Sequence, residues 1–376
     1  MNSMTTLKLG EHYNPLTALE LGMHFNESLK PGDIPDTITY LTLGFCFNTP
    51  LKPGDIPNSV KRLDFGTNFN QLLKPGDIPD SVTYIKFEYY CQPINPGVIP
   101  NSVTFLDFGY MHNIPLRVGD IPNSVIHLEL GDNFNSKLEP GIIPNSVKYL
   151  VFGKQFNQPL KPGNIPNSVT HLVFGRKTEQ HISNSYFNNT VYNSYFNQPL
   201  KPGDIPNSVT HLKFGSLFNC RLGNLPNSIT HLFLGDAFDQ PLKPGDIPNS
   251  VTHLVFGKNF DQILYPRDIP DSVTYLEFGR YFGKPLTIDV IPNSVLYFSI
   301  GISYPYFLEN LLDSTTYIKF ISCNLVVSRE YYCNKWSYYS CKYFQDPFYN
   351  NIFMSKINSS ILSDIPTELL FYLLEY

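Results

Sequence analysis

The chain has 376 residues, 42% of them hydrophobic, and 27 Lys and Arg residues against 32 Asp and Glu residues give it a formal net charge of −5 at pH 7. Because this charge is thinly spread and no basic block is present, we expect no nucleic-acid partner. No apolar run approaches the roughly 20 residues of a membrane-spanning helix, and the first residues lack the apolar stretch of a signal peptide. These features predict a cytoplasmic protein without a membrane partner.

Residues 1–24 contain short Leu-x-Leu segments, each followed by glycine. The residues concerned are Leu7, Leu9 and Gly10, then Leu19, Leu21 and Gly22. Such truncated units are expected at the end of a repeat array, where a terminal coil has to cover the core. We therefore predict degenerate N-terminal coils that cap the array.

Residues 25–301 repeat a unit of 22 residues, best written I-P-N-S-V-T-H-L-x-F-G-x-x-F-N-Q-P-L-K-P-G-D. The proline near the start of each unit stands at Pro35, Pro57, Pro79, Pro100, Pro122, Pro144, Pro166, Pro206, Pro226, Pro248, Pro270 and Pro292. Most neighbours in this series are 22 residues apart. A fixed period in this range indicates a solenoid, in which each coil stacks on the next.

The coil that begins at Ile56 shows how a unit should fold. Leu63 and Phe65 alternate with polar neighbours, as in a strand with one buried face, and Pro75-Gly76 suits the centre of a type II turn. Burying about six side chains at ~1.5–3 kcal/mol each cannot offset the ordering of a whole coil, so the coils must share a core. The pattern predicts a leucine-rich-repeat-like β-solenoid of right-handed coils of about 22 residues, with one long parallel sheet and a small α-containing C-terminal cap.

The period is interrupted where 40 residues separate Pro166 from Pro206. The irregular or inserted segment, residues 176–195, is rich in Ser, Asn and Tyr. Asn189 to Phe196 can be aligned with the strand signature N-S-V-T-H-L-K-F, which would make the segment a degenerate coil. A loop that bulges from the solenoid fits the composition equally well, and the sequence leaves both interpretations open.

Asparagine recurs after the second phenylalanine of the unit. It stands at Asn48, Asn70, Asn113, Asn135, Asn157 and Asn219, and is replaced at Asp239, Asp261 and Gly283. Asn, Asp and Gly share turn geometry but not recognition chemistry, so an internal ladder that satisfies backbone groups is favoured over a polar recognition surface.

Strand alternation places two side chains per coil on the outer face of the sheet. Over the central coils these positions pair valine or phenylalanine with histidine or tyrosine, between charged flanks. Exposed apolar patches with polar rims often bind proteins, and aromatic residues are frequent interface anchors. We therefore predict a protein-binding face formed by Tyr149, Val151, His171, Val173, His211, His231, Phe233, His253 and Val255.

Other interpretations of this face remain. His211, His231 and His253 fall on consecutive coils and could share a metal, but Tyr, Arg and Phe take the same position elsewhere, so we expect no metal and no cofactor. The row could also be a half-exposed feature that repeat duplication preserved, or one that residues 176–195 cover. No motif of a nucleotide-binding protein, metalloprotease, serine hydrolase or kinase occurs, so we predict no enzymatic activity.

After residue 301 the pattern fades. Residues 302–320 keep a strand signature without the Ile-Pro and are predicted to be a degenerate C-terminal coil. Residues 321–376 are rich in aromatic residues and end in an amphipathic segment that reads as a helix, with Asp364 as its N-cap. The cysteines in this region have no neighbouring histidine and are not spaced like zinc ligands, so no metal is expected there.

The segments Phe47-Asn48-Thr49-Pro50-Leu51 and Phe156-Asn157-Gln158-Pro159-Leu160, each followed by K-P-G-x-I-P, resemble the FNIP repeat family. That family is related to the leucine-rich repeats and is abundant in social amoebae and in giant viruses that infect amoebae. The resemblance covers roughly residues 25–301. It implies a repeat without enzymatic activity of its own and, for a viral protein, a place in the host cytoplasm.

In related proteins the repeats are often joined to an F-box, which docks a substrate receptor onto a ubiquitin ligase. The end of the chain resembles the opening of an F-box at Ile365, Pro366, Glu368, Leu369, Leu370 and Leu373, although an amphipathic cap helix would show the same pattern. The repeats predict a protein-interaction scaffold, which we expect to be monomeric. The F-box-like end implies a ubiquitin-ligase adaptor as one partner. The alternatives are a purely structural repeat protein without a ligase link and an enzyme that uses the C-terminal region.

Overall fold

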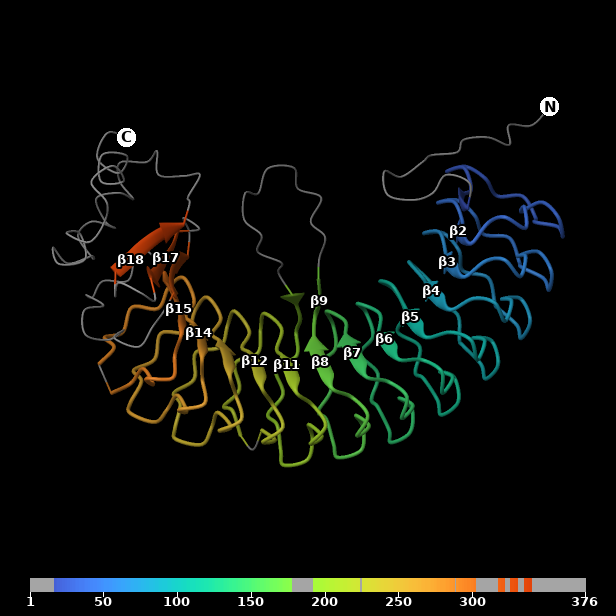
Figure 1. Ribbon diagram of the computed structural model, residues 1–376. Helices are drawn as coiled ribbons and strands as arrows, with labels where there is room; N and C mark the ends of the chain where they lie inside the picture. The colour runs from blue at the N-terminus through green and yellow to red at the C-terminus, as the bar shows by residue number, and fades with distance from the viewer. Residues whose placement is uncertain are drawn as a thin grey trace. The chain divides into compact units, whose positions relative to one another are not determined.

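The computed structural model describes residues 17–177, 192–223, 225–287 and 289–301, together with strands at 317–321, 325–330 and 335–339. All regular elements in this described part are β-strands, and most of them build a parallel β-solenoid of about 12 turns (Figure 1). The contacts between coils divide the chain into a first unit, residues 1–198 and 203–209, and a second unit, residues 199–202 and 210–376.

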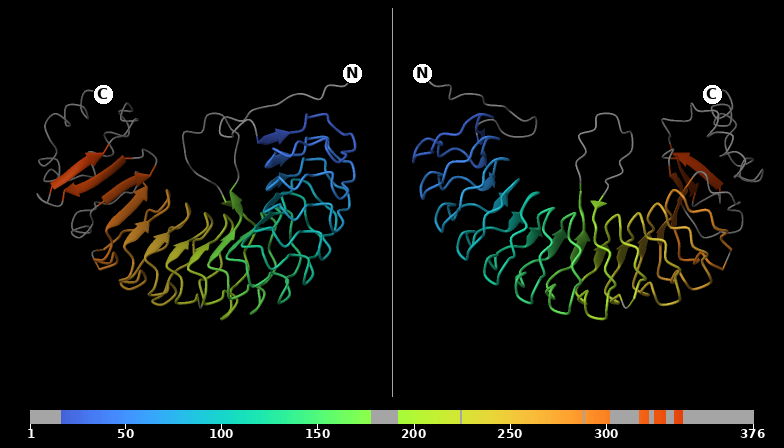
Figure 2. Two further views of the ribbon diagram at one scale, coloured as in Figure 1. Left: turned by 45° about the vertical axis from the view of Figure 1, so that its right-hand side comes forward. Right: turned by 180° about the vertical axis from the view of Figure 1, so that it is seen from behind.

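In the first unit each coil contributes a short strand that pairs in parallel with the strand of the next coil, side by side along one face of the stack (Figure 2). These strands are β1 (Ala18–Glu20), β2 (Tyr40–Thr42), β3 (Arg62–Asp64), β4 (Tyr84–Lys86), β5 (Phe105–Asp107), β6 (His127–Glu129), β7 (Tyr149–Phe152) and β8 (His171–Phe174). Register follows the repeat, so that Leu63 stands between Leu41 and Ile85. All three side chains are fully buried and lie at the centre of the core.

The second unit continues the same pattern and then departs from it. Its parallel strands are β11 (His211–Lys213), β12 (His231–Phe233), β13 (His253–Val255), β14 (Tyr275–Glu277), β15 (Tyr297–Gly301) and β16 (Tyr317–Ile321). β17 (Leu325–Glu330) and β18 (Lys335–Tyr339) then pair antiparallel. The α-containing cap expected for residues 321–376 is therefore not supported: its described part is β-structure, and the expected helix lies outside the described residues.

Two backbone features explain why the coils stack at this spacing. Gly66 ends its strand and lies directly against the preceding coil, so that a Cβ at this position would collide with the carbonyl oxygen of Gly44. Gly76 has φ +92°, as the predicted type II turn requires, and the Asp77 carboxylate accepts the Lys74 amide at 2.7 Å. The backbone amide of Asp77 donates back to the carbonyl of Lys74 at 3.1 Å, which closes the turn.

Between strand and turn, each coil is joined to the next by a ring stack and by an amide. Phe47 stacks on Phe69 with ring centroids 6.1 Å apart. Asn48 Oδ1 accepts the backbone amide of Asn70 at 2.9 Å, and the same contact recurs between Asn135 and Asn157. The predicted internal asparagine ladder is confirmed.

Where the period is interrupted, the chain departs from the parallel sheet directly after β8. β9 (Arg176–Lys177) and β10 (Tyr192–Asn193) form a separate antiparallel pair (Figure 1). Phe196 then resumes the repeat, because its ring stacks on Phe174 at 4.0 Å and the Asn197 amide donates to Asn157 Oδ1 at 3.0 Å. These contacts favour an insertion into one coil over a degenerate coil of its own.

Candidate functional site

The first outward side chain of each strand belongs to a continuous stack of rings in the first unit, which we call the ring row. Its members are Tyr40, Arg62, Tyr84, Phe105, His127, Tyr149 and His171. From Tyr84 to His171, the centroids of neighbouring rings are separated by 4.2 to 5.6 Å. The Arg62 guanidinium takes the place of a ring, 4.6 Å from the centroid of Tyr40 and 4.1 Å from that of Tyr84. A stacked aromatic pair stabilises the fold by about 0.5–1.5 kcal/mol, in addition to the free energy gained from the surface area that it buries.

The ring row of the second unit consists of His211, His231, His253, Tyr275 and Tyr297. The imidazoles of His211, His231 and His253 stack at 4.1 Å, with interplanar angles of 13° and 14°. The Nδ1 atom of each lies 2.9 to 3.0 Å from the hydroxyl of the preceding threonine. Burial lowers the pKa of His211 and of His253, so neutral imidazole is favoured on this face.

The stacked geometry disfavours the metal interpretation of these histidines. A ring nitrogen offers its lone pair in the plane of the ring, so nearly parallel rings aim their lone pairs along parallel lines rather than at one point. Within the part of the chain that the structure describes, no group of three or more His, Cys, Asp or Glu residues could hold a metal ion.

The second outward side chain of each strand forms the adjacent row. In the first unit it includes Val151 and Val173, and in the second unit Phe233 and Val255, all half-buried. Lys213 lies in the same row with its Nζ 5.3 Å from the centroid of Phe233. Burial lowers the pKa of Lys213 to about 8, although Asp236 opposes the shift.

The structure therefore places all nine predicted face residues on the outer side of the sheet. Tyr149 is 42% exposed, and the other eight are half-buried by their neighbours in the stack. Tyr149, Val151, His171 and Val173 lie in the first unit. His211, His231, Phe233, His253 and Val255 lie in the second.

The charged flank of the first unit contains a residue that sequence reasoning missed. Arg176, the first residue of β9, pairs through Nη2 with Asp107 at 2.5 Å and with Glu129 at 3.1 Å. Burial raises the pKa of Asp107 to about 6, although Arg176 opposes the shift. Burial acts the same way on Glu129, but hydrogen bonding from His127 and the charge of Arg176 outweigh it and lower the pKa of Glu129. The only sequence signal was an arginine directly after Gly175, where the 22-residue period is interrupted.

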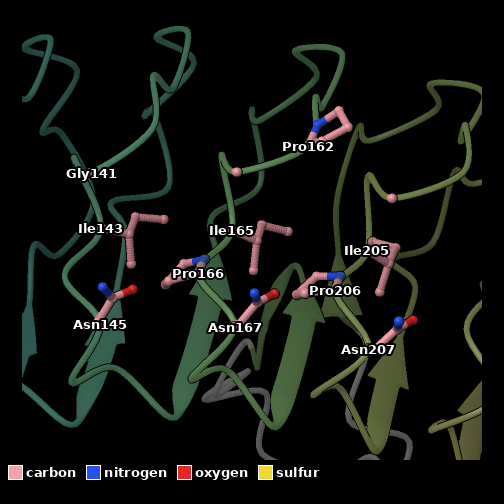
Figure 3. Close-up of a pocket in the computed structure, with 12 residues that line it drawn as sticks. Gly141, Ile143, Asn145, Pro162, Ile165, Pro166, Asn167, Ile205, Pro206 and Asn207 are labelled. Atoms are coloured by element: carbon pink, nitrogen blue, oxygen red, sulfur yellow. The ribbon is translucent and has the colours of Figure 1, made fainter.

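A groove of about 430 Å³ lies on another surface of the first unit (Figure 3). Its walls repeat from coil to coil: Asn145, Asn167 and Asn207 lie in a row beside Ile143, Ile165 and Ile205. None of its lining residues carries a titratable side chain, so it offers no acid–base chemistry.

The F-box-like residues Ile365, Pro366, Glu368, Leu369, Leu370 and Leu373 lie outside the described residues, as does the cysteine- and aromatic-rich stretch around Trp336 apart from its strand backbone. No helix in the described part of the chain is long and apolar enough to cross a bilayer.

Comparison with known proteins identifies the repeat. The FNIP Repeat family matches residues 14–46, 47–89, 69–111, 112–155, 156–187, 196–237, 238–267 and 260–303. A solved structure described as CroV588, a novel circular LRR protein, is similar with a TM-score of 0.67 and 38% sequence identity. The similarity covers 81% of this chain and 46% of that one, so the chain spans about half the length of this relative. No curated protein matches the chain.

Proposed function

Because the chain belongs to the FNIP repeat family, we propose that it is a non-enzymatic protein-interaction scaffold whose partner binds the outer face of the sheet. The observation that carries the proposal is the ring row with the apolar part of the adjacent row beside it. A rigid row of stacked rings loses little conformational entropy on binding, which suits aromatic anchors at interfaces.

The adjacent row offers the cleaner test, because its side chains are not part of the ring stack. Phe233→Ala combined with Val255→Ala should weaken partner binding about 10- to 30-fold, as expected for truncated anchors, with a small change in Tm. The control is Ile263→Ala, an apolar side chain that is 51% exposed away from the strands. Quantitative affinity capture should show partners that the control retains and the double variant loses. If both variants retain the same partners, the proposed face is wrong.

The lowered pKa values of His211 and His253 set the direction of a pH effect. A partner that covers the imidazoles favours their neutral form, so protonation competes with binding. Affinity should hold at pH 7.5 and fall as the pH drops below the ordinary histidine value of about 6.5. His253→Phe, which keeps a ring in the stack, should reduce this pH dependence. Affinity that rises on acidification would contradict the assignment.

As a finer role we propose that the scaffold presents targets to a ubiquitin ligase in the cytoplasm, which is the host cytoplasm for a viral protein. Support comes from the F-box-like residues between Ile365 and Leu373 and from the family resemblance. Removing residues 361–376 should abolish capture of a ligase adaptor and leave face-dependent partners bound. Unchanged capture of the adaptor removes the ligase role but keeps the scaffold.

We further propose that the protein acts as a monomer. The relative described as circular is about twice as long as the matched part of this chain, so two copies closing a ring is the competing arrangement. Light scattering on the purified chain distinguishes the two, since only a ring of two copies gives twice the chain mass.

A further inference from the structure

On the outer face of the first unit, four groups surround the guanidinium of Arg176, and we call this set of groups the pocket. Nη1 donates to the carbonyl of Gly109 at 2.6 Å, while Nη2 contacts Asp107 Oδ2 at 2.5 Å and Glu129 Oε2 at 3.1 Å. Cζ lies 5.8 Å from the ring centroid of Tyr110. Two carboxylates, a carbonyl and an aromatic ring are the groups with which proteins recognise an arginine side chain.

The coils hold these groups in place independently of Arg176. Asp107 Oδ1 accepts the backbone amide of Gly109 at 2.7 Å, and Glu129 Oε1 lies 3.1 Å from Nε2 of His127. Each carboxylate thus has one oxygen fixed by the solenoid and the other turned to the guanidinium. The pocket is pre-organised, which lowers the cost of binding any guanidinium.

The pocket is specific to these coils and is not a product of the repeat. Among the described glycines that end strands, positive φ occurs at Gly109 (+68°) and Gly175 (+99°), the first lining the pocket and the second preceding Arg176. Asp107 is 3% exposed. In the other three-residue strands of this unit the same row is half-buried in β2, β3, β4 and β6 and exposed in β1. The unusual φ angles of Gly109 and Gly175 and the deep burial of Asp107 therefore all occur at the pocket.

Other charged groups near the pocket do not replace Arg176. Lys86 pairs with Glu88 at 2.8 Å, and Asp132 adds a further negative charge that acts on Arg176. Without Arg176, the buried Asp107 would lack a hydrogen-bonded cation, and Glu129 would keep only its contact with His127. A pocket with this charge favours a guanidinium over a neutral or acidic ligand.

We propose that this pocket is an arginine-recognition site for a partner protein, and that Arg176 fills it in cis as a competitor. The proposal rests on the scaffold function and names its partner class: a protein that presents an arginine side chain to the sheet. Arg176 reaches the pocket from the inserted segment, whereas every other group of the pocket belongs to the coils, so exchange of one arginine for another leaves the coils in place.

The test uses the full chain with Arg176→Ala and N-acetyl-arginine methylamide as the probe. A tethered side chain competes at millimolar or higher effective concentration, so the variant should bind the probe at least about tenfold more tightly than the wild type. N-acetyl-citrulline methylamide, which has the same shape without the charge, should not bind. The control Arg280→Ala, an exposed arginine of the second unit, should behave like the wild type.

Calorimetric titration gives the affinities, and thermal shift gives a second readout if Arg176→Ala is destabilised. The arginine probe should then raise the Tm of the variant and the citrulline probe should not. Adding Asp107→Asn should abolish both effects. Equal response to the two probes, or none to either, overturns the pocket. Probe binding without any partner protein that competes for it would keep the pocket and overturn the proposed partner class, while the scaffold function would still depend on the test of Phe233 and Val255.

Discussion

At the scale of single residues, His112 shows what happens when the core ring that Phe47 and Phe69 supply in other coils is replaced by an imidazole. Its imidazole is fully buried and stacks on Phe108 at 4.5 Å and on Tyr90 at 6.5 Å. Burial lowers its pKa to about 4, against a weaker opposing effect of the Tyr90 backbone. Because the unfolded chain binds a proton near pH 6.5 and the folded chain does not, this residue stabilises the fold less as the pH falls from about 6.5 to 4.

The expected result of His112→Phe is a fold that resists acid better. The variant should match the wild type to within about 1 kcal/mol at pH 7.5 and exceed it by roughly 2–3 kcal/mol near pH 4.5, following from 1.36 kcal/mol per unit of pKa shift. Urea unfolding at the two pH values measures the difference. His24→Phe is the control, because the side chain of His24 is exposed. An equal pH dependence in His112→Phe and the wild type would show that another group carries it.

At the scale of elements, the asparagine ladder joins coils where the chain has no sheet. Asn157 Oδ1 accepts the backbone amide of Asn197 at 3.0 Å and the Gln198 side chain at 3.0 Å, across the insertion. Truncating Asn157 leaves an amide without its acceptor, which costs about 1–3 kcal/mol.

Asn157→Ala should therefore lower the free energy of unfolding by about 1–3 kcal/mol and speed hydrogen exchange at the Asn197 amide. Asn157→Asp should retain most of the stability, since Asp239 fills the same role with its Oδ1 2.9 Å from the Asp261 amide. Asn145→Ala, at an exposed position along the groove, is the matched control. Slow exchange at Asn197 in Asn157→Ala would mean that the ladder does not hold this coil.

How far the sequence predicted the molecule depends on whether a feature repeats. The buried Leu63 position, the Gly76 turn and the Asn48 ladder recur with the period, so spacing alone placed them correctly. Arg176 and Asp107 are 69 positions apart in the sequence but form a hydrogen bond. Their contact depends on the insertion and on the positive φ of Gly175, and neither is encoded by the period. The ring row was predicted as outward-facing, but its stacking depends on side-chain rotation that strand alternation leaves open.

At the scale of the whole molecule, stability should follow the connections between neighbouring coils. In a solenoid each coil contacts only those beside it, so free energy is approximately a sum of coil and interface contributions. A defect in one interface should then lower protection in the coils next to it and less so in distant ones. We therefore expect each of the two units to lose protection separately when a defect lies within it.

Gly257→Ala creates such a defect in the second unit. A Cβ there would collide with the carbonyl oxygen of Gly235, so the coils of β12 and β13 have to separate, at a cost of at least about 3 kcal/mol. The matched control is Gly223→Ala, whose Cβ would lie 3.7 Å from the Leu200 carbonyl oxygen, an ordinary contact. Hydrogen exchange with mass spectrometry should show lost protection in β12 and β13 while β3 and β4 remain protected. If protection falls equally in both units, the solenoid unfolds as one cooperative block and the boundary between units has no thermodynamic meaning.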